Sequence, residues 1–450
     1  MFNTIMGLAW PTMLEHLMHT GVSYIDTAMV GSLGTAATAA VGSTTTINWL
    51  LNGTISAIGV GFLSFIARSC GAGDKKAASR ASMQAVISVL VAGSFFTILT
   101  LSLSGIIPVW MQVDESIRPL AARYFFIIYL PMLPRTASII FGTVLRAAGD
   151  TKTPMKVGII VNLINVALNF LLIYPTRIIE IAGNSYTMFG AGLGVTGAAI
   201  ASAVAFLWGG IHITAVLWRH PMVSPKGQKF SLDIQILRPC VKVSFPNMLQ
   251  MFGTSLGYVA FAAMINSLGE ISTAAHTIAN TVESAFYIPA YGMQTAAATL
   301  SGNAYGAKDK NRMNRLARMF IPIEIALMAV SGSVLFLLAP RLVMIFSKSA
   351  DVILLGTTVL RMVAVSEPFY GFSIIVEGMM IGMGNTKKPF LFSVLGMWGV
   401  RIIGTFICTS LLSLGLVSAW ACMIAHNLLL FCLYLMCFIK ARKNLLEMGK

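Results

Sequence analysis

Three ionisable side chains share one face of the first long apolar segment. At about 100° per residue, Glu15, His19 and Asp26 fall within about 40° of one another on an ideal helix, along a stripe roughly 16 Å long. A carboxylate near the centre of a bilayer costs at least about 2.5–3.5 kcal/mol, so an acid retained there is a functional candidate. Asp26, in the run GVSYIDTAMVG, could bind a proton or Na⁺ and release it as its surroundings wet and dry. The alternative is that Glu15 and Asp26 only bond to neighbouring helices.

Amide side chains recur at helical spacing in the fifth apolar segment. Asn162, Asn165 and Asn169 form one stripe. Amides coordinate cations and bond to carboxylates across helices, so the stripe favours either a cation site or interhelical contacts.

The second half of the chain holds further acids at membrane depth. Tyr287 and Tyr291 follow Glu283 by one and two helical turns, and Glu377 lies in a later apolar segment. An acidic pocket lined by aromatic rings suits an organic cation.

A structural alternative exists for these acids. Glu283, Glu367 and Glu377 could supply the counter-charge that the intramembrane Arg361 and Arg401 need. We expect Glu324 to be solvated near the end of its segment.

These residues must be positioned by membrane helices. Of the 450 residues, 56% are hydrophobic and only 10% are charged, whereas a soluble domain carries about 25% charged residues. Lipid cannot satisfy exposed backbone groups, so the fold class is an all-α polytopic membrane protein. Runs of spanning length predict twelve transmembrane helices, at 7–31, 40–68, 82–105, 117–144, 155–175, 189–217, 243–266, 272–302, 316–338, 353–381, 390–411 and 415–439.

The basic residues indicate an orientation. Most of the 31 Lys and Arg fall in the loops after even-numbered spans and in the tail. The positive-inside rule therefore predicts a multi-pass protein of the cytoplasmic membrane with both termini in the cytoplasm, and it explains the net charge of +15 without nucleic acid. The six cysteines show no paired spacing, so neither a disulfide framework nor a metal site is expected.

The chain repeats itself at an offset of 235 residues. Pro11 aligns with Pro246, and the motifs GAGDKK and AAGDTKTP align with GAKDKN and GMGNTKKP. We expect two six-helix lobes, at 1–217 and 243–450, joined by a cytoplasmic connector at 218–242. An even number of spans makes them parallel repeats related by a pseudo-twofold axis along the membrane normal, with a cavity between them that suits alternating access. The first half carries about 14 extra residues near 176–190 on the outer side.

The quoted motifs resemble the MATE (multidrug and toxic compound extrusion) family over the full length. So does the opening segment from Pro11 to Gly34, and so does GVTGAAIAS in the sixth span. The resemblance implies that Asp26 binds the coupling ion, with Asn165, Asn169 and Ser202 completing the site. Thr254 and Tyr370 stand where one branch has acids, so a C-lobe sodium site is not expected. Glu15 and His19 are not general family features.

The resemblance implies a secondary antiporter, not an enzyme, that exports amphipathic or cationic small molecules while H⁺ or Na⁺ moves inward. We expect no cofactor, no metal beyond Na⁺ at Asp26, and a monomer in the lipid bilayer. Glu15, His19, Glu283, Tyr287 and Glu377 are the substrate or cavity candidates. The alternative function is export or flipping of a lipid-linked or glycan precursor, which would favour a cationic cavity. A membrane-embedded enzyme would need a convergent catalytic set, which the scattered His and Cys do not supply.

Overall fold

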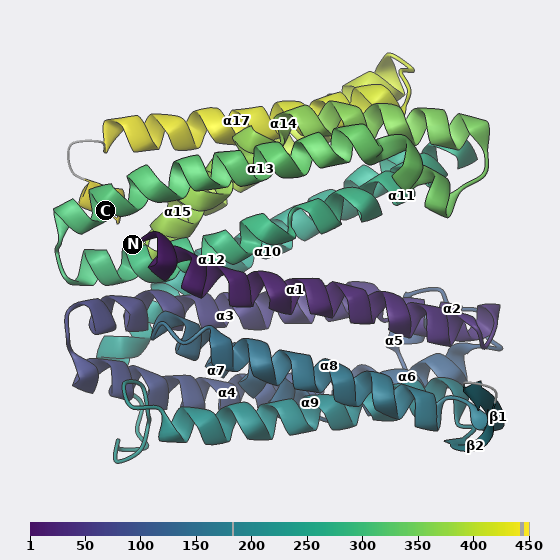
Figure 1. Cartoon of the computed structure of the whole chain (residues 1–450), viewed down its shortest axis with the longest axis horizontal. Helices are drawn as coiled ribbons and strands as arrows, with labels where there is room; N and C mark the ends of the chain where they lie inside the picture. The colour runs from purple at the N-terminus through teal and green to yellow at the C-terminus, as the bar shows by residue number, and fades with distance from the viewer. Residues whose placement is uncertain (182–183, 442–444, 450) are drawn as a thin grey trace.

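The computed structural model describes residues 1–181, 184–441 and 445–449, which form a bundle of long helices (Figure 1). The first half of the chain contains α1 (Phe2–Gly31), α2 (Thr35–Gly42), α3 (Thr45–Gly71), α4 (Lys75–Leu103), α5 (Ile107–Trp110), α6 (Arg118–Tyr129), α7 (Met132–Ala147), α8 (Lys152–Leu172), β1 (Pro175–Ile181), β2 (Asn184–Ala191) and α9 (Gly194–Arg219).

The second half repeats this order without the strands. It contains α10 (Ile234–Asn266), α11 (Glu270–Phe286), α12 (Ile288–Gly306), α13 (Lys310–Phe346), α14 (Ala350–Met383), α15 (Lys387–Val394), α16 (Ile403–Phe406) and α17 (Leu416–Lys440). Two π-helical segments, Leu395–Ile402 and Ile407–Leu411, join α15 and α16 into one passage, and a 3₁₀ turn covers Leu445–Gly449.

The helices make twelve passages through the bundle, as expected. Among the described residues, nine are long and apolar enough to cross a membrane, and the α6–α7 pair, bent by 50°, makes a tenth. The other two passages are α1 and the broken pair α11–α12. These two hold Glu15, Asp26 and Glu283, whose polarity lowers their hydropathy.

Several helices begin before the apolar runs that predicted them. α4, α10 and α13 start at Lys75, Ile234 and Lys310, whereas we expected 82, 243 and 316. An aspartate caps each start: Asp74 accepts from the Ala77 N–H at 2.8 Å, Asp233 from Gln235 at 3.1 Å, and Asp309 from Arg312 at 2.8 Å. Hydropathy overlooks these polar first turns. The link between α9 and α10 is therefore 220–233, shorter than 218–242.

The repeat reappears in the backbone. Gly34 and Gly269, 235 residues apart, have φ of 109° and 99° just before α2 and α11. Gly149 and Gly384, at the same offset, have φ of 89° and 90°. Only glycine adopts such angles readily, so the repeated glycines lie at equivalent helix boundaries in both halves.

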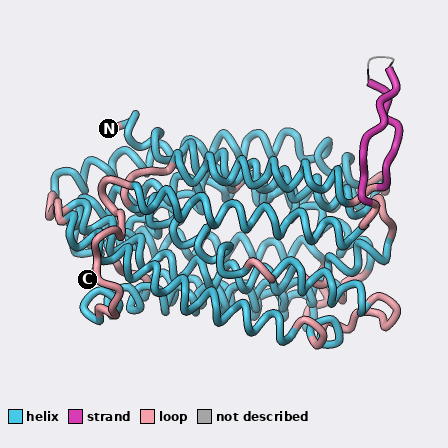
Figure 2. The backbone as a smooth tube through the Cα atoms, turned by 90° about the horizontal axis from the view of Figure 1, so that it is seen from below, coloured by secondary structure: helices cyan, strands magenta, loops and turns pink. Residues whose placement is uncertain are grey.

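The extra segment of the first half is a β-hairpin. β1 pairs antiparallel with β2, from Pro175 opposite Ala191 to Ile181 opposite Asn184. It projects beyond the helices at the end of the bundle opposite both termini (Figure 2). We call these ends the hairpin end and the terminal end. The predicted start of the sixth span at 189 was wrong, because Phe189 belongs to β2.

Two lobes, α1–α9 and α10–α17, lie side by side in Figure 1, and α1 packs on both. Near the terminal end, Ile5, Leu8 and Ala9 of α1 are buried in the core of the second lobe with residues of α12 and α14. Nearer the hairpin end, α1 bonds to α8 of its own lobe.

The lobes meet closely at the terminal end. A Cβ at Gly71 would lie 2.0 Å from the Asn303 carbonyl oxygen, and one at Gly306 would lie 1.9 Å from that of Arg68. A Cβ at Gly61 would lie 2.5 Å from the Cys240 carbonyl. Backbones touch here because these positions have no side chain.

Candidate functional site

Asp26 lies in a hydrogen-bonded network inside the first lobe. Asn169 of α8 donates to Asp26 Oδ1 at 2.6 Å. The Asn165 amide lies 2.9 Å from both Asp26 Oδ1 and Ser202 Oγ of α9, and we orient it so that its nitrogen donates to Asp26 and its oxygen accepts from Ser202. Helical spacing puts both asparagines on the face of α8 that meets α1. The structure thus brings together the four residues proposed for the coupling ion.

The network offers oxygen ligands and little positive charge. Asn165 and Asn169 are 6% and 1% exposed, while Asp26 is half-buried. The Asn169 Oδ1 atom has no hydrogen-bond partner among the described residues. A carboxylate held by neutral amides keeps its charge, so the group can take up a proton or a hard cation such as Na⁺. Asn162 takes no part in this network.

Glu15 differs from Asp26 in having a charged partner. Both of its carboxylate oxygens accept from Arg146 Nη2 of α7, at 2.6 and 2.7 Å. A Cβ at Gly158 would lie 3.4 Å from the Glu15 side chain, so α8 passes close behind the pair. This ion pair joins α1 to α7 and neutralises Glu15.

His19 is exposed, and the described residues supply no side-chain partner for it. One turn earlier, the exposed His16 ring lies 6.3 Å from the Tyr291 ring of the second lobe. Trp49 of α3 likewise lies 6.1 Å from Tyr258 of α10. Aromatic rings from the two lobes therefore lie close to one another at two places.

Glu283, Tyr287 and Glu367 come together inside the second lobe. Tyr287 donates a short hydrogen bond to Glu283, and its ring packs edge-on against Tyr370 at 5.2 Å. Glu283 is 3% exposed and Glu367 is fully buried. Acids thus lie beside Tyr370 although Tyr370 itself is not acidic.

Glu377 belongs to a separate polar cluster. Gln250 of α10 donates to Glu377 at 2.8 Å and to Ser393 of α15 at 2.9 Å. This carboxyl therefore bonds helices of the second lobe to one another and does not meet Glu283.

One expectation and one alternative about the buried charges were wrong. Glu324 is not solvated: it is 0% exposed, and neither oxygen has a partner among the described residues, because α13 begins at Lys310 and carries Glu324 into the lobe. In the described part of the chain, Arg361 and Arg401 form no ion pair with an acid. Arg361 instead donates to the Phe336 carbonyl at 3.3 Å.

Sequence inspection missed the partners Arg146, Gln250 and Ser393, yet the 235-residue offset could have found two of them. Gln250 is the repeat of Glu15, and Ser393 is the repeat of Gly158. The same offset relates Asn48 to Glu283 and Arg135 to Tyr370. In the first lobe Arg135 donates to Asn48 at 3.1 Å, so this pair of positions carries a basic residue in the first lobe and an acidic residue in the second.

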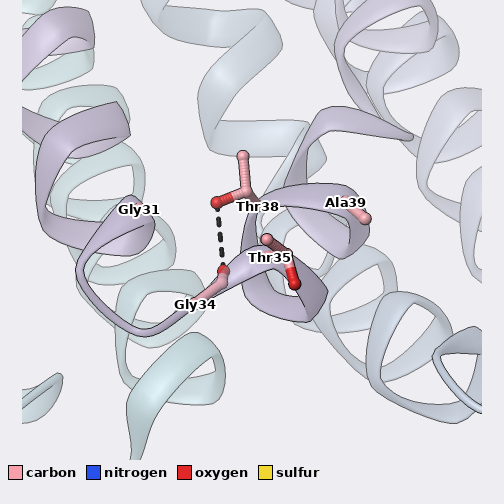
Figure 3. A pocket seen from close by; sticks show the side chains of 5 residues that line it. All are labelled: Gly31, Gly34, Thr35, Thr38 and Ala39. Carbon is pink, nitrogen blue, oxygen red and sulfur yellow. Dashed lines mark hydrogen bonds between the residues drawn. The ribbon is translucent and has the colours of Figure 1, made fainter.

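A surface hollow lies away from these acids. Its volume is about 440 Å³, and it is lined by Gly31, Gly34, Thr35, Thr38 and Ala39 at the turn between α1 and α2 (Figure 3). Thr38 donates to the Gly34 carbonyl at 3.2 Å there. This surface hollow carries no ionisable group and does not change the choice of Asp26. Across the described ranges, no group of three or more His, Cys, Asp or Glu could hold a metal ion.

Comparison with known proteins decides the family. The model of the MatE family matches residues 11–171 and 246–407, which fall in both repeats. The chain belongs to the MatE family. It is 27% identical over 443 residues to the probable multidrug resistance protein NorM of Thermotoga maritima, covering 97% of this chain and 92% of that one. It is 23% identical to the probable multidrug resistance protein YoeA of Bacillus subtilis, covering 91% and 87%.

Solved structures of MATE transporters share the fold. One, described as the outward-facing conformation of a multidrug resistance MATE family transporter, matches with a TM-score of 0.89 and 22% identity, covering 99% of this chain and 96% of that one. A transporter of the wider MOP superfamily from Pyrococcus furiosus matches with a TM-score of 0.89 and 23% identity, covering 100% and 96%. The protein is thus a member of a multi-pass membrane transporter family with a two-lobe, twelve-helix fold.

Proposed function

We propose that the protein is a cation-coupled antiporter that exports amphipathic, often cationic, small molecules. Asp26 binds the coupling cation, H⁺ or Na⁺, and Asn165, Asn169 and Ser202 hold the carboxylate in place. The observation that carries the proposal is the Asp26 network, in which an intramembrane acid has only neutral partners.

Alternating access is supported by the lobe contacts. The lobes touch through Gly71, Gly306 and Gly61 at the terminal end. Near the hairpin end, most of α1 between His16 and Ala28 is exposed. Such an arrangement suits an outward-facing state, in which Asp26 is reached from the hairpin end.

The substrate class follows from the surfaces between the lobes. His16 and Tyr291, with Trp49 and Tyr258, present rings from both sides. Aromatic faces bind organic cations and flat apolar groups without demanding one shape. The relatives named as multidrug resistance proteins support this class.

The cellular setting completes the proposal. Lys and Arg gather in the loops of the terminal end, and this distribution supports, by the positive-inside rule, an orientation with that end and both termini in the cytoplasm. The protein then acts as a monomer in the cell membrane, with its hairpin outside.

Flux in proteoliposomes tests the coupling. We expect uptake of a fluorescent cationic dye to be driven by an imposed pH or Na⁺ gradient, and to be lost in Asp26→Asn. Asp114→Asn, in an exposed loop, is the matched control and should transport normally. Dye flux in Asp26→Asn that still follows the gradient would refute the assignment. Gradient-independent movement of a labelled lipid-linked precursor would favour a flippase instead.

A further inference from the structure

A buried arginine in the second lobe forms no ion pair with an acid among the described residues. Arg401 is 3% exposed, and its side chain makes no ion pair or hydrogen bond within residues 1–181, 184–441 and 445–449. Its Cζ atom lies 4.2 Å from the centre of the Phe261 ring and 4.9 Å from that of Tyr258. Cation–π contacts offset only part of the penalty of burying a charge, which is several kcal/mol per ion.

Other buried polar side chains in this part of the second lobe also lack hydrogen-bond partners, and His276 and His426 among them are close enough to Arg401 to interact with it electrostatically. Trp420 Nε1 and Thr405 Oγ1 are in fully buried residues, and both nitrogens of His426 are unpaired in the described structure. His276, whose Nδ1 is unpaired, packs against Phe261 at 5.6 Å and Trp420 at 5.9 Å. Buried polar groups are rarely left unmatched, so several in one place indicate a ligand.

We infer that Arg401, His276, Thr405, Trp420 and His426 form a binding site for a small monovalent anion, either chloride or the carboxylate of an organic molecule. A guanidinium, an indole N–H, a hydroxyl and the single N–H of a neutral imidazole can all donate, and an anion is the ligand that accepts from such groups.

The backbone is adapted to this cluster. Arg401 lies in the π-helical segment Leu395–Ile402, and π-helical turns occur frequently at functional sites. Gly396 of the same segment makes room for His426, because a Cβ there would lie 2.2 Å from the imidazole ring.

Glu283 is the carboxyl close enough to act electrostatically on Arg401. Glu283 accepts a hydrogen bond from Tyr287 and forms no ion pair with Arg401 in the described structure. The guanidinium N–H groups therefore have no direct partner in the described structure and could donate to a bound anion. The site lies in the opposite lobe from Asp26 and does not depend on the proposed cation coupling.

Thermal unfolding of the purified protein tests the inference. At constant ionic strength, replacing isethionate, a bulky sulfonate, with chloride or acetate should raise the unfolding midpoint saturably, by about 2–4 °C. Arg401→Met should abolish the rise. Arg361→Met is the matched control, because it removes an intramembrane arginine that already bonds to a carbonyl, and it should keep the rise.

The outcomes are distinguishable. A rise with chloride alone assigns a halide, and a rise with acetate assigns a carboxylate. An unchanged midpoint in the native protein, or an equal rise in Arg401→Met, overturns the inference. If Arg401→Met does not fold, Trp420→Phe decides: it should raise the half-saturating concentration several-fold, and an unchanged value would refute the site.

Discussion

The partners of each intramembrane acid separate the roles of Asp26 and Glu15, which share a helix face. Arg146 cancels the charge of Glu15, whereas the amides of Asn165 and Asn169 orient Asp26 without cancelling it. A neutral hydrogen-bonding shell therefore distinguishes an acid that can exchange cations from one that fixes two helices together.

Removing one amide should change the affinity of the ion site for its cation while leaving the fold intact. Asn165→Ala deletes a hydrogen bond to a charged group, worth about 1.5–3 kcal/mol, so the Na⁺ or H⁺ concentration for half-maximal dye transport should shift about tenfold or more. Asn162→Ala, one turn earlier on α8 and outside the network, should change nothing. Equal shifts in both variants would mean that the network is not the coupling site.

We expect that replacing Glu324 does not destabilise the protein. Its carboxyl is buried without a partner in the described structure. Glu324→Met should therefore leave the thermal unfolding midpoint unchanged or raise it, because the free energy of unfolding should increase by up to about 1–3 kcal/mol. Glu377→Met should lower the midpoint, because it strands the Gln250 amide. A lower midpoint for Glu324→Met would show that this acid has a partner.

At the scale of elements, the sequence predicted the number of helices better than their contacts. Apolar runs and the 235-residue repeat extend over many residues, so single polar positions do not obscure them. Periodicity predicts the face of the helix on which Glu15 lies, but it does not predict which helix packs against that face. Arg146 lies beyond the predicted end of its span at 144, so it appeared to be a loop residue. The burial of Glu324 was missed for a related reason, since the capped start of α13 at Lys310 shifts its depth.

The link between the lobes should respond to pH through His220, which follows α9. Its Nδ1 accepts the backbone N–H groups of Met222 and Val223, at 3.2 and 3.4 Å. Burial lowers the pKa of His220 from its ordinary value, and Asp150 only partly opposes this shift. The folded state thus binds fewer protons than the unfolded state, so the stabilisation is complete above about pH 6.5 and is lost as the pH falls through the lowered pKa.

Hydrogen–deuterium exchange measures this effect. After correction for the intrinsic rate, exchange of Met222 and Val223 amides should accelerate on going from pH 7.5 to pH 5. In His220→Ala it should be fast at both values. Protection that does not vary with pH in the native protein would contradict the assignment.

At the scale of the whole molecule, the terminal end is closed by backbone contacts that tolerate no side chain. Gly306→Ala places a Cβ 1.9 Å from the Arg68 carbonyl, which should force the lobes apart there. Cys240, 2% exposed at the same end, should then react faster with a maleimide, as measured by mass spectrometry of its peptide. Gly42→Ala, with open space around its Cβ, is the control. Unaltered Cys240 labelling in Gly306→Ala would argue against closure at this end.

The placement of α1 makes the two repeats interdependent. Ile5, Leu8 and Ala9 fill the core of the second lobe, while Asp26, farther along the same helix, is fastened to α8 of the first. If the two halves were produced as separate polypeptides, the first half would expose the apolar start of α1. The second half would expose the part of its core that α1 covers. A change in the charge of Asp26 therefore alters the hydrogen bond that holds α1 to α8, while the opposite end of α1 is packed in the core of the second lobe.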